Sequence, residues 1–445
     1  MSSAPREHWT SRTGFVLAAV GSAVGLGNMW RFSYLTAEKG GAAFVLLVVL
    51  FTLAVGLPVM LAELTIGRGA QRSPIQALAH YGGRRWTWLG ALFVASGFLI
   101  LAYYGVIAGW ALRYVGAALT DAYAGDPGAY FSEASQGWDS FACQVVFMAV
   151  TVAIVSGGVR AGIERVASWM MPALFALVVG IAIYAATLPG GDAGYAYYLN
   201  MNFDRVWDRD VIVAAAGHSF FSLSLGMGAM LTFASYLSRD HNLPNEALII
   251  TSVDFGVAFM AGMMVFPLIF ALGLQGEIMQ KDMGTLGALF VALPKAFAEM
   301  GTAGRIVGSA FFIALVVGAL TSALSLLEVV VAAAIDGLGW PRRRAAVAMG
   351  SLITLLGARA AFDINTLDVM DTLANNVFLI GGGLGLAIFT GWVMRDPIDE
   401  VRKGAEGTRW FFAWRLLLRF VVPVVLGVIL LVSAPDTWKK VEMLF

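Results

Sequence analysis

The sequence predicts an all-α protein that crosses a membrane many times. Of its 445 residues, 59% are hydrophobic and only 13% are charged. Apolar runs recur from one end of the chain to the other, each of about 18 or more residues, the length an α-helix needs to cross a bilayer. A water-soluble domain of this size would carry far more charge. The expected fold class is therefore a polytopic helical membrane protein.

Charged residues, glycines and prolines delimit the apolar runs, which predict about eleven transmembrane helices. The helices are expected near residues 13–36, 41–67, 87–119, 141–156, 165–187, 211–237, 246–273, 305–335, 343–361, 366–394 and 410–433. A segment near 284–299 is apolar but short, and it contains Pro294 and Lys295. We interpret it as a loop helix packed over the protein; a twelfth span is the alternative. No linker divides the chain, so residues 1–445 are predicted to form one transmembrane domain.

The composition argues against several classes of function. The net charge is zero and no basic run stands apart from a helix end, so no nucleic-acid partner is expected. The single cysteine, Cys143, has no partner for a disulfide, and no Cys/His cluster has metal-ligand spacing. Catalytic motifs such as GxSxG and HExxH are absent, which predicts that the protein is not an enzyme. No cleavage site follows the polar N-terminus MSSAPREHWTSR, so no removable signal peptide is expected.

The distribution of basic residues predicts the orientation in the membrane. With the N-terminus in the cytoplasm, the inner loops hold an excess of Lys and Arg, including Arg68, Arg72, Arg84, Arg85 and the run Arg342 to Arg344. The loop at 120–140 contains four acidic residues and no basic one, as suits an outer loop. An odd number of spans then leaves the C-terminus outside.

Two of the expected helices are interrupted at mid-depth. The first contains AVGSAVGLGNMWRF from Ala19 to Phe32, and the sixth contains HSFFSLSLGMGAMLTF from His218 to Phe233. Each begins a block of five helices, near 13–187 and 211–394, which predicts a five-plus-five inverted repeat with an extra helix at 410–433. Unwound backbone leaves polar groups that need a ligand or water at membrane depth. The alternative is that the glycines only allow close helix packing.

Three motifs carry a family resemblance. SAVGLGNMWRF in the first span, FFSLSLGMGA followed by ASY in the sixth, and GALTSALSLLE in the eighth resemble the neurotransmitter:sodium symporters, most closely the bacterial amino-acid members. The resemblance runs from REHW near the N-terminus to LDVMD in the tenth span. It implies the LeuT fold with discontinuous helices 1 and 6, in a bacterial inner membrane. It also implies uptake of an amino acid driven by sodium through alternating access.

The resemblance implies two sodium sites. The first would be formed by the Ala23 carbonyl, Asn28, Ser222, the Asp254 carboxylate and the carboxylate of the substrate. The second would be formed by the carbonyls of Gly21, Val24 and Gly318 with the hydroxyls of Thr321 and Ser322. Hard cations favour such oxygen ligands. Independently of the family, the hydroxyl side chains of the LTS motif in the otherwise apolar eighth span indicate a polar function. The alternative is that they only bond to carbonyls of their own helix, as such hydroxyls often do.

Asp254 predicts that chloride is not required. A carboxylate at membrane depth is a functional candidate by default. Chloride-dependent relatives have a neutral side chain at the matching position, and this chain supplies its own anion. His218 and Val48 also replace halide ligands of those relatives. His218 either bonds or exchanges a proton with Asp254, or is an interior histidine with satisfied hydrogen bonds and no role in transport.

Gly25 predicts the class of substrate. Monoamine carriers of the family have an aspartate at the matching position, so glycine implies a ligand that brings its own carboxylate. By resemblance, that carboxylate would bind the amides of Leu26 and Gly27 and the hydroxyl of Tyr104. The substrate ammonium would meet carbonyls near Ala23, Phe221, Ser222 and Ser224. The residues that the resemblance implies around the substrate side chain are uncharged and suit a neutral, hydrophobic or aromatic L-amino acid: Ser22, Ile100, Tyr104, Phe221, Ser224, Met227, Ser322 and Leu326.

The resemblance also implies gates on both sides. Arg31 and Asp371 would form the outer ionic gate. Arg6 and Asp336 would form the inner pair, with Trp9, Ser235 and Tyr236 nearby; exposed ion pairs are otherwise weak contacts of little consequence. In span five, Gly162 and Pro172 have the spacing at which relatives unwind the helix. An ordinary proline kink is the alternative.

Two other functions remain open on the sequence. One is an amino-acid sensor or ligand-gated channel built on the same scaffold, and the other is a sodium-independent amino-acid exchanger. The intact GALTS motif and Asn28 argue against the exchanger. The absence of an additional soluble signalling domain argues against the sensor. The expected partners are therefore the amino acid, sodium ions and the lipid bilayer.

Overall fold

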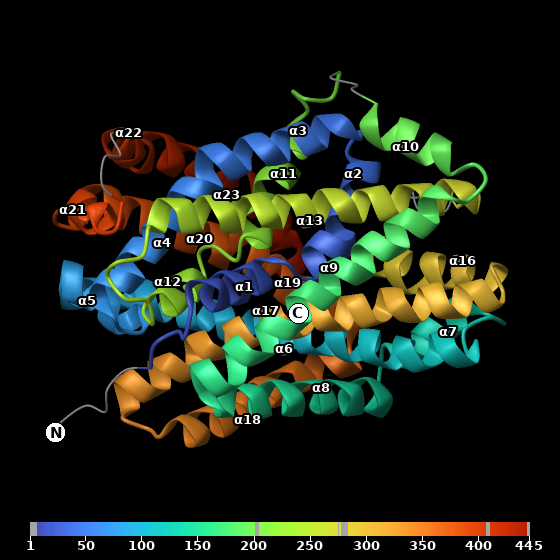
Figure 1. The fold of residues 1–445 in the computed structure, drawn as a ribbon, viewed down its shortest axis with the longest axis horizontal. Helices are drawn as coiled ribbons and strands as arrows, with labels where there is room; N and C mark the ends of the chain where they lie inside the picture. Colours follow the sequence, from blue (N-terminus) through green and yellow to red (C-terminus); the bar gives the residue numbers. More distant parts are fainter. Residues whose placement is uncertain (1–6, 201–203, 275, 277–283, 406–409, 443–445) are drawn as a thin grey trace.

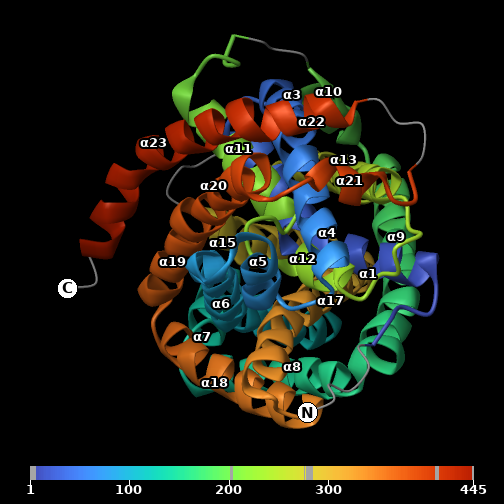
Figure 2. The same cartoon turned by 90° about the vertical axis from the view of Figure 1, so that its left-hand side faces the viewer.

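The computed structural model describes residues 7–200, 204–274, 276, 284–405 and 410–442, and these residues form helices and connecting turns without a β-strand. Figure 1 shows the long helices lying side by side along one axis, and Figure 2 views the same bundle from one end. Nine helical stretches in the described part of the chain are long and apolar enough to cross a membrane. The two interrupted spans complete the predicted set of eleven.

The spans have the following bounds in chain order: α1 (Arg12–Ala23), η1 (Gly27–Arg31) and α2 (Phe32–Glu38); α3 (Ala42–Phe51), η2 (Thr52–Gly56) and α4 (Leu57–Ala70); α6 (Thr87–Thr120); α8 (Trp138–Ser156); η4 (Val159–Glu164) and α9 (Arg165–Ala186); α11 (Arg209–Ser222) and α12 (Ala229–Ala234); α13 (Leu243–Ala271); α17 (Thr302–Leu338); α18 (Arg342–Phe362); α19 (Ile364–Leu373), η6 (Ala374–Leu379), α20 (Ile380–Ile388) and η7 (Phe389–Val393); α22 (Phe411–Leu416), η8 (Leu417–Val421) and α23 (Val422–Glu442). Shorter helices lie between them: α5 (Pro74–Gly82), η3 (Arg84–Trp86), α7 (Pro127–Ala134), α10 (Gly191–Leu199), α15 (Gly284–Gly287), η5 (Ala288–Ala292), α16 (Leu293–Glu299) and α21 (Pro397–Arg402).

Both predicted interruptions are present. In span one, α1 ends at Ala23, Val24 is extended with φ −77° and ψ 103°, and the helix resumes at Leu26. In span six, turns separate α11 from α12, and Gly226 and Gly228 have φ values of 76° and 72°. A Cβ atom at Gly226 would lie 2.2 Å from the Leu379 carbonyl oxygen, so this glycine permits both the turn and a close approach to span ten. Helix breaking and close packing therefore occur together.

The segment at 284–299 folds as three short helices, α15, η5 and α16, and a turn at Gly301 leads into α17. It is absent from the nine described stretches that could cross a membrane, in agreement with a loop helix. The last helix continues to Glu442 rather than ending near 433. Hydropathy does not predict the last turns of this helix, because Lys439 and Lys440 lower the apolar content there. A helix that continues beyond the bilayer can contain such charged residues.

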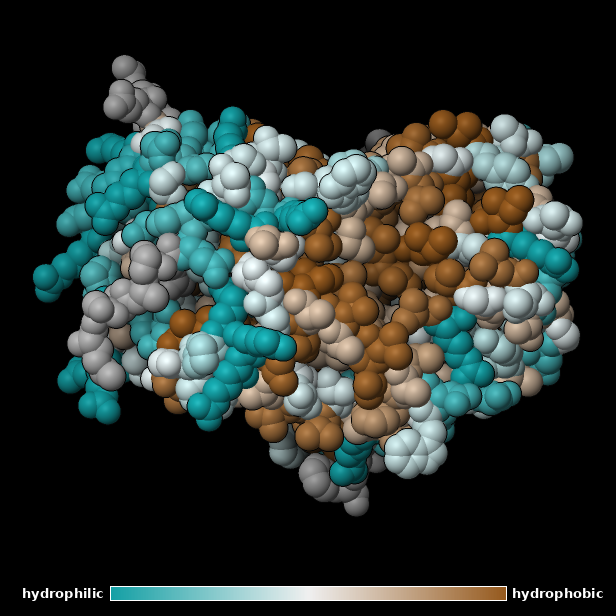
Figure 3. Space-filling view, turned by 60° about the horizontal axis from the view of Figure 1, so that its bottom comes forward, coloured by the Kyte–Doolittle hydropathy of each residue, from teal (hydrophilic) through white to brown (hydrophobic). Residues whose placement is uncertain are grey.

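The outer surface of the bundle is apolar where a soluble protein would be polar. Figure 3 shows hydrophobic residues gathered over the middle of one face, with hydrophilic residues concentrated toward one end. Large apolar side chains stand exposed on the outward helices α8 and α18, among them Val146, Val150, Leu352 and Leu355. A contiguous apolar surface of this kind fits contact with lipid.

Candidate functional site

The two interruptions meet at a cavity in the middle of the bundle. Its volume is about 20 Å³, and α6 and α17 complete its walls. All the substrate residues predicted from the sequence line it except Leu26, which borders a larger outer cavity instead. The lining residues are Ser22, Ala23, Gly25, Gly27, Asn28, Ile100, Tyr104, Phe221, Ser222, Ser224, Met227, Ser322 and Leu326.

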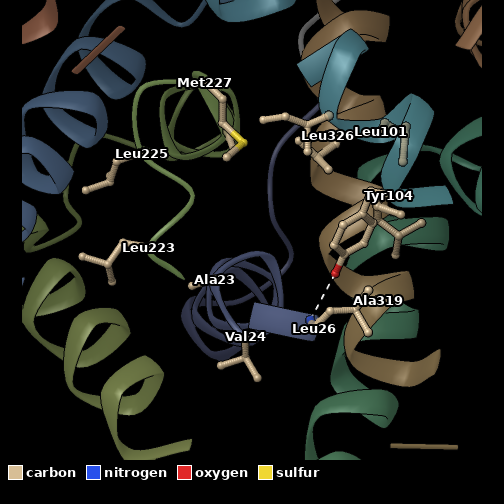
Figure 4. Close-up of a cluster of buried hydrophobic side chains, with 14 of the residues drawn as sticks. Ala23, Val24, Leu26, Leu101, Tyr104, Leu223, Leu225, Met227, Ala319 and Leu326 are labelled. Carbon is tan, nitrogen blue, oxygen red and sulfur yellow. Dashed lines mark hydrogen bonds between the residues drawn. The ribbon is translucent and has the colours of Figure 1, made fainter. Parts of the chain in front are cut away.

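The cavity has a polar end and an apolar end. At the polar end, the Leu26 amide N–H in the first interruption donates to the Tyr104 hydroxyl oxygen at 3.2 Å. Figure 4 shows this contact, with Met227 and Leu326 lying at some distance from it. No charged side chain lines the cavity. This distribution of polar and apolar groups is compatible with an uncharged amphipathic ligand, although a volume of about 20 Å³ holds only about one water molecule in this conformation.

Three side chains of the predicted first sodium site, those of Asn28, Ser222 and Asp254, form one buried network, and Ala23 lines the central cavity. Asp254 accepts from the Asn28 amide nitrogen at 2.7 Å through one carboxylate oxygen and from the Ser222 hydroxyl at 2.7 Å through the other. The Asn28 nitrogen also lies 3.0 Å from the Ser222 oxygen, and the Asn28 oxygen accepts from the Gly25 N–H at 3.1 Å. This set of oxygens around a buried carboxylate fits a small cation.

The predicted second set lies between α1 and α17. The Ser322 hydroxyl is 3.3 Å from the Gly21 carbonyl oxygen, and the Thr321 hydroxyl donates to the Gly318 carbonyl at 3.0 Å. A Cβ atom at Gly318 would lie 3.7 Å from the Val24 carbonyl oxygen. All five predicted ligands are therefore neighbours. The uncharged oxygens of these five residues suit a monovalent cation. The Met171 side chain of α9 packs against Gly21 on the same side of α1 as Thr321.

The outer cavity has a volume of about 390 Å³ and adjoins the central one, since Gly27, Tyr104 and Phe221 border both. The predicted outer gate spans it. Arg31 lies 3.8 Å from Asp371, with both side chains about 30% exposed, and the Arg31 guanidinium lies 5.1 Å from the centre of the Phe221 ring. Such a long, half-exposed ion pair is weak, so it can open and close at little cost.

On the side predicted to face the cytoplasm, Trp9 holds the chain before α1 against span six. Its ring N–H donates to the Phe233 carbonyl oxygen at 2.9 Å, and its ring packs edge-on against Tyr236. Ser235 is buried beside them. Asp336 accepts from the Ser73 N–H at 2.6 Å. Its predicted partner, Arg6, lies outside the described residues.

A buried ionic cluster lies next to the contacts of Trp9 and Tyr236. Glu328 accepts from the Tyr236 hydroxyl at 2.5 Å and from Arg342 at 2.7 Å. Arg342 also pairs with Glu7 at 3.1 Å, so α17, α18, span six and the N-terminal segment are joined at one point. The run from Arg342 to Arg344 predicts the orientation in the membrane, but its spacing in the sequence does not reveal Glu328 as a partner of Arg342.

Span five is helical through both marked residues. Gly162 lies in η4 and Pro172 lies inside α9, with no unwound residue between them. The sequence left an unwound helix and an ordinary proline kink as alternatives. In this conformation Pro172 lies within a continuous helix, as in the second alternative. A Cβ atom at Gly162 would lie 2.1 Å from the Ile154 carbonyl oxygen, so the glycine permits close packing of η4 on the end of α8.

His218 does not bond to Asp254 in this structure. Its two ring nitrogens are buried and have no hydrogen-bond partner among the described residues, and its ring packs against Phe32 and Phe44. Asn28 and Ser222 occupy both oxygens of Asp254 instead. The hydrogen-bonded alternative is therefore not realised here. The histidine is interior, but it is unsatisfied rather than satisfied.

Three further residues support the site and were not identified from the sequence. Glu63 accepts from the Gly226 and Leu231 N–H groups at 2.9 and 3.1 Å and so holds the interruption of span six. Glu164 binds the start of α1, and Ser325 binds Ser22. Glu63 could have been found, because a carboxylate inside an apolar run is itself a signal. The partners of Glu164 and Ser325 are distant in sequence and leave no local pattern.

Comparisons with known proteins agree with this architecture. The model of the sodium:neurotransmitter symporter family matches residues 6–127 and 135–442. The chain is 34% identical to an uncharacterized sodium-dependent transporter, YhdH, of Bacillus subtilis over 97% of this chain and 98% of the relative. It is 33% identical to one from Methanocaldococcus jannaschii, over 98% of this chain and 92% of that relative. A crystal structure of MhsT in complex with L-phenylalanine superposes with a TM-score of 0.87, at 41% identity, covering 96% of this chain and 100% of that chain.

Proposed function

This chain belongs to the sodium:neurotransmitter symporter family, whose members are transporters and not enzymes, and on that premise we propose that it imports a neutral, hydrophobic or aromatic L-amino acid together with sodium. Alternating access would move both inward, without a chloride requirement. The observation that carries this proposal is the cavity formed where the two interrupted helices meet, with Asp254, Asn28 and Ser222 clustered beside it. The amino-acid ligand bound to MhsT supports the same class of substrate.

Sodium is proposed to bind at both oxygen sets. At the first, the Asn28 side chain would turn its oxygen from the Gly25 N–H toward the ion, leaving the Asp254 carboxylate free to coordinate. At the second, the Gly21, Val24 and Gly318 carbonyls and the Thr321 and Ser322 hydroxyls would coordinate. Because the substrate carboxylate would itself be a ligand of the first ion, ion and amino acid would each bind weakly without the other.

The gates follow from the same geometry. Arg31, Asp371, Tyr104 and Phe221 would close the outer side over the ligand. Trp9, Tyr236 and Asp336, with Arg6, would close the inner side. We propose an inner-membrane protein of bacteria with a cytoplasmic N-terminus and an external C-terminus, which the distribution of arginines supports.

Counterflow of labelled amino acid in proteoliposomes, with and without sodium, tests the proposal. A symporter exchanges label only when sodium is present. Equal exchange in choline would indicate a sodium-independent exchanger instead. Sodium-dependent binding without any exchange or uptake would indicate a sensor. Scintillation binding of twenty labelled amino acids in saturating sodium would then identify the preferred substrate.

A further inference from the structure

A pair of buried serines lies at the inner end of the central cavity. Ser22 is on α1, on the cytoplasmic side of the first interruption, and Ser325 is on α17, one turn deeper than Ser322. Their hydroxyl oxygens are 2.7 Å apart, and each residue is 1% exposed. Ser22 lines the cavity together with Met227 and Leu326, whereas Ser325 lies behind it.

The direction of this hydrogen bond is fixed by a third group. The Ser325 hydroxyl lies 2.8 Å from the Ser322 carbonyl oxygen, and a carbonyl can only accept. A hydroxyl has one proton, so Ser325 uses its proton on Ser322. The bond between the two serines must then be donated by Ser22. This assignment follows from counting protons and needs no observed hydrogen position.

The count leaves Ser22 as an acceptor. Its own proton is used on Ser325, and no group among the described residues donates to its oxygen. A hydroxyl oxygen has two acceptor sites. Ser22 borders the cavity beside Ile100, Met227 and Leu326. A ligand that reaches the Ser22 hydroxyl oxygen can donate to it and leave the bond to Ser325 intact, whereas a ligand that accepts from Ser22 would have to displace that bond.

We propose that Ser22 and Ser325 select substrates whose side chain ends in a hydrogen-bond donor within an otherwise apolar body, namely the indole N–H of tryptophan and the phenol O–H of tyrosine. The inference rests on the proposed function and narrows its substrate class. Met227 is unbranched and flexible, so it can move aside for a ring of this size. A donor buried against Ser22 keeps its hydrogen bond, whereas an acceptor there would face another acceptor.

Competition binding against labelled leucine in sodium tests the inference, with the full-length protein and pairs of ligands that differ in one atom. Tryptophan is compared with 3-benzothienylalanine, in which sulfur replaces the ring N–H at nearly constant size. We expect the wild-type protein to prefer tryptophan by about 3- to 10-fold, the worth of one such hydrogen bond. In Ser22→Ala that preference should disappear when the affinity of each ligand is expressed relative to that of leucine in the same variant. Ser96→Ala, a buried serine bonded within α6, is the matched control and should keep the preference.

Ser325→Ala gives the sharper result. It removes the acceptor of the Ser22 proton, so the Ser22 hydroxyl can turn that proton into the cavity. We expect 4-pyridylalanine, which ends in an acceptor, to gain affinity relative to phenylalanine by about 3- to 10-fold. Equal losses for tryptophan and benzothienylalanine in Ser22→Ala, or no change of ranking in either variant, would overturn the inference. If no amino acid bound in a sodium-dependent way, the proposed function itself would fail.

Discussion

Gly25 shows how closely single residues define the central cavity. A Cβ atom at this position would lie 2.6 Å from the Ser322 hydroxyl and 2.8 Å from the Tyr104 hydroxyl. Tyr104 in turn accepts from the Leu26 N–H, so neither neighbour can move without disturbing the interruption. The sequence predicted that glycine leaves room for a substrate carboxylate. The structure adds that a single methyl group at this position would force the Ser322 and Tyr104 hydroxyls to shift.

Gly25→Ala is therefore expected to lower sodium-dependent amino-acid binding at least tenfold, measured by scintillation proximity on the purified protein. Gly217→Ala is the matched control. It introduces the same methyl group in α11, where no atom lies within 4 Å, and alanine is favoured over glycine inside a helix by about 0.5–1 kcal/mol. Binding should be unchanged in this variant. Wild-type affinity in Gly25→Ala would contradict the proposed location of the substrate.

Asp254 provides the second prediction at this scale. Its carboxylate is 3% exposed and is joined to Asn28 and Ser222, so a fixed negative charge lies within the proposed first sodium site. Replacing external chloride with gluconate should leave the initial rate of uptake unchanged. Asp254→Asn should weaken the apparent sodium affinity at least tenfold, whereas Asp240→Asn, in an exposed loop, should not. Loss of uptake in gluconate would disprove the role assigned to this charge.

Among the elements, α1 is held at its inner end by two carboxylates from different helices. Glu164 accepts from the Thr10 and Ser11 N–H groups at 2.8 and 3.2 Å, and a negative charge at a helix N-terminus is stabilising. On the other side, the buried Glu246 of α13 pairs with Arg12 at 2.6 Å. Since α1 carries proposed ligands of both sodium ions, its attachment to spans five and seven bears directly on when those sites can open inward.

Glu164→Ala should release this end of α1. Hydrogen exchange measured by mass spectrometry is expected to become faster across residues 10–20, because buried amides lose their acceptor at about 1–3 kcal/mol. Glu133→Ala, in the exposed outer helix α7, is the control and should leave α1 unchanged. Unaltered exchange in Glu164→Ala would show that Glu246 and the helix contacts suffice to hold α1.

The elements also show what sequence reasoning could and could not reach. The interruptions of spans one and six were predictable, because glycines and polar residues at mid-depth contradict a continuous membrane helix. The attachment of α1 was not, because Thr10 and Glu164 are 154 positions apart and each is ordinary in its own surroundings. The conformation of span five was likewise undetermined. Gly162 and Pro172 permit both a kinked and an unwound helix, and only tertiary packing selects one.

Over the whole molecule, the eleven-span architecture followed from hydropathy, and the list of cavity residues followed from the family resemblance. Neither hydropathy nor the resemblance predicted the contacts between spans, such as those of Glu63 with Gly226 and Glu328 with Arg342. These pairs depend on how the helices are rotated against each other. Apolar content along a lipid-facing helix constrains that rotation only weakly.

Coupling between ion and substrate should be visible in the stability of the entire fold. A ligand that binds the folded state raises its stability by RT ln(1 + [L]/Kd). If the substrate carboxylate and the first sodium share a site, amino acid and sodium together should raise the melting temperature by more than the sum of their separate effects. Potassium in place of sodium is the control and should remove the effect of the amino acid. Additive shifts would indicate independent sites.

The number of sodium ions can be read from the voltage dependence of accumulation. A neutral amino acid at pH 7 is a zwitterion without net charge, so two ions per cycle would carry two positive charges inward. Each charge gains about 2.3 kcal/mol per 100 mV, and about 1.4 kcal/mol corresponds to a factor of ten.

With equal sodium on both sides of a proteoliposome, a potential of 100 mV, negative inside, should concentrate the substrate by more than roughly a thousandfold. One ion would give only about fiftyfold. A potassium diffusion potential varied in steps measures the slope, with Gly25→Ala vesicles as the control. A single-charge slope would mean that one proposed site is not used, or that a proton leaves the vesicle in exchange.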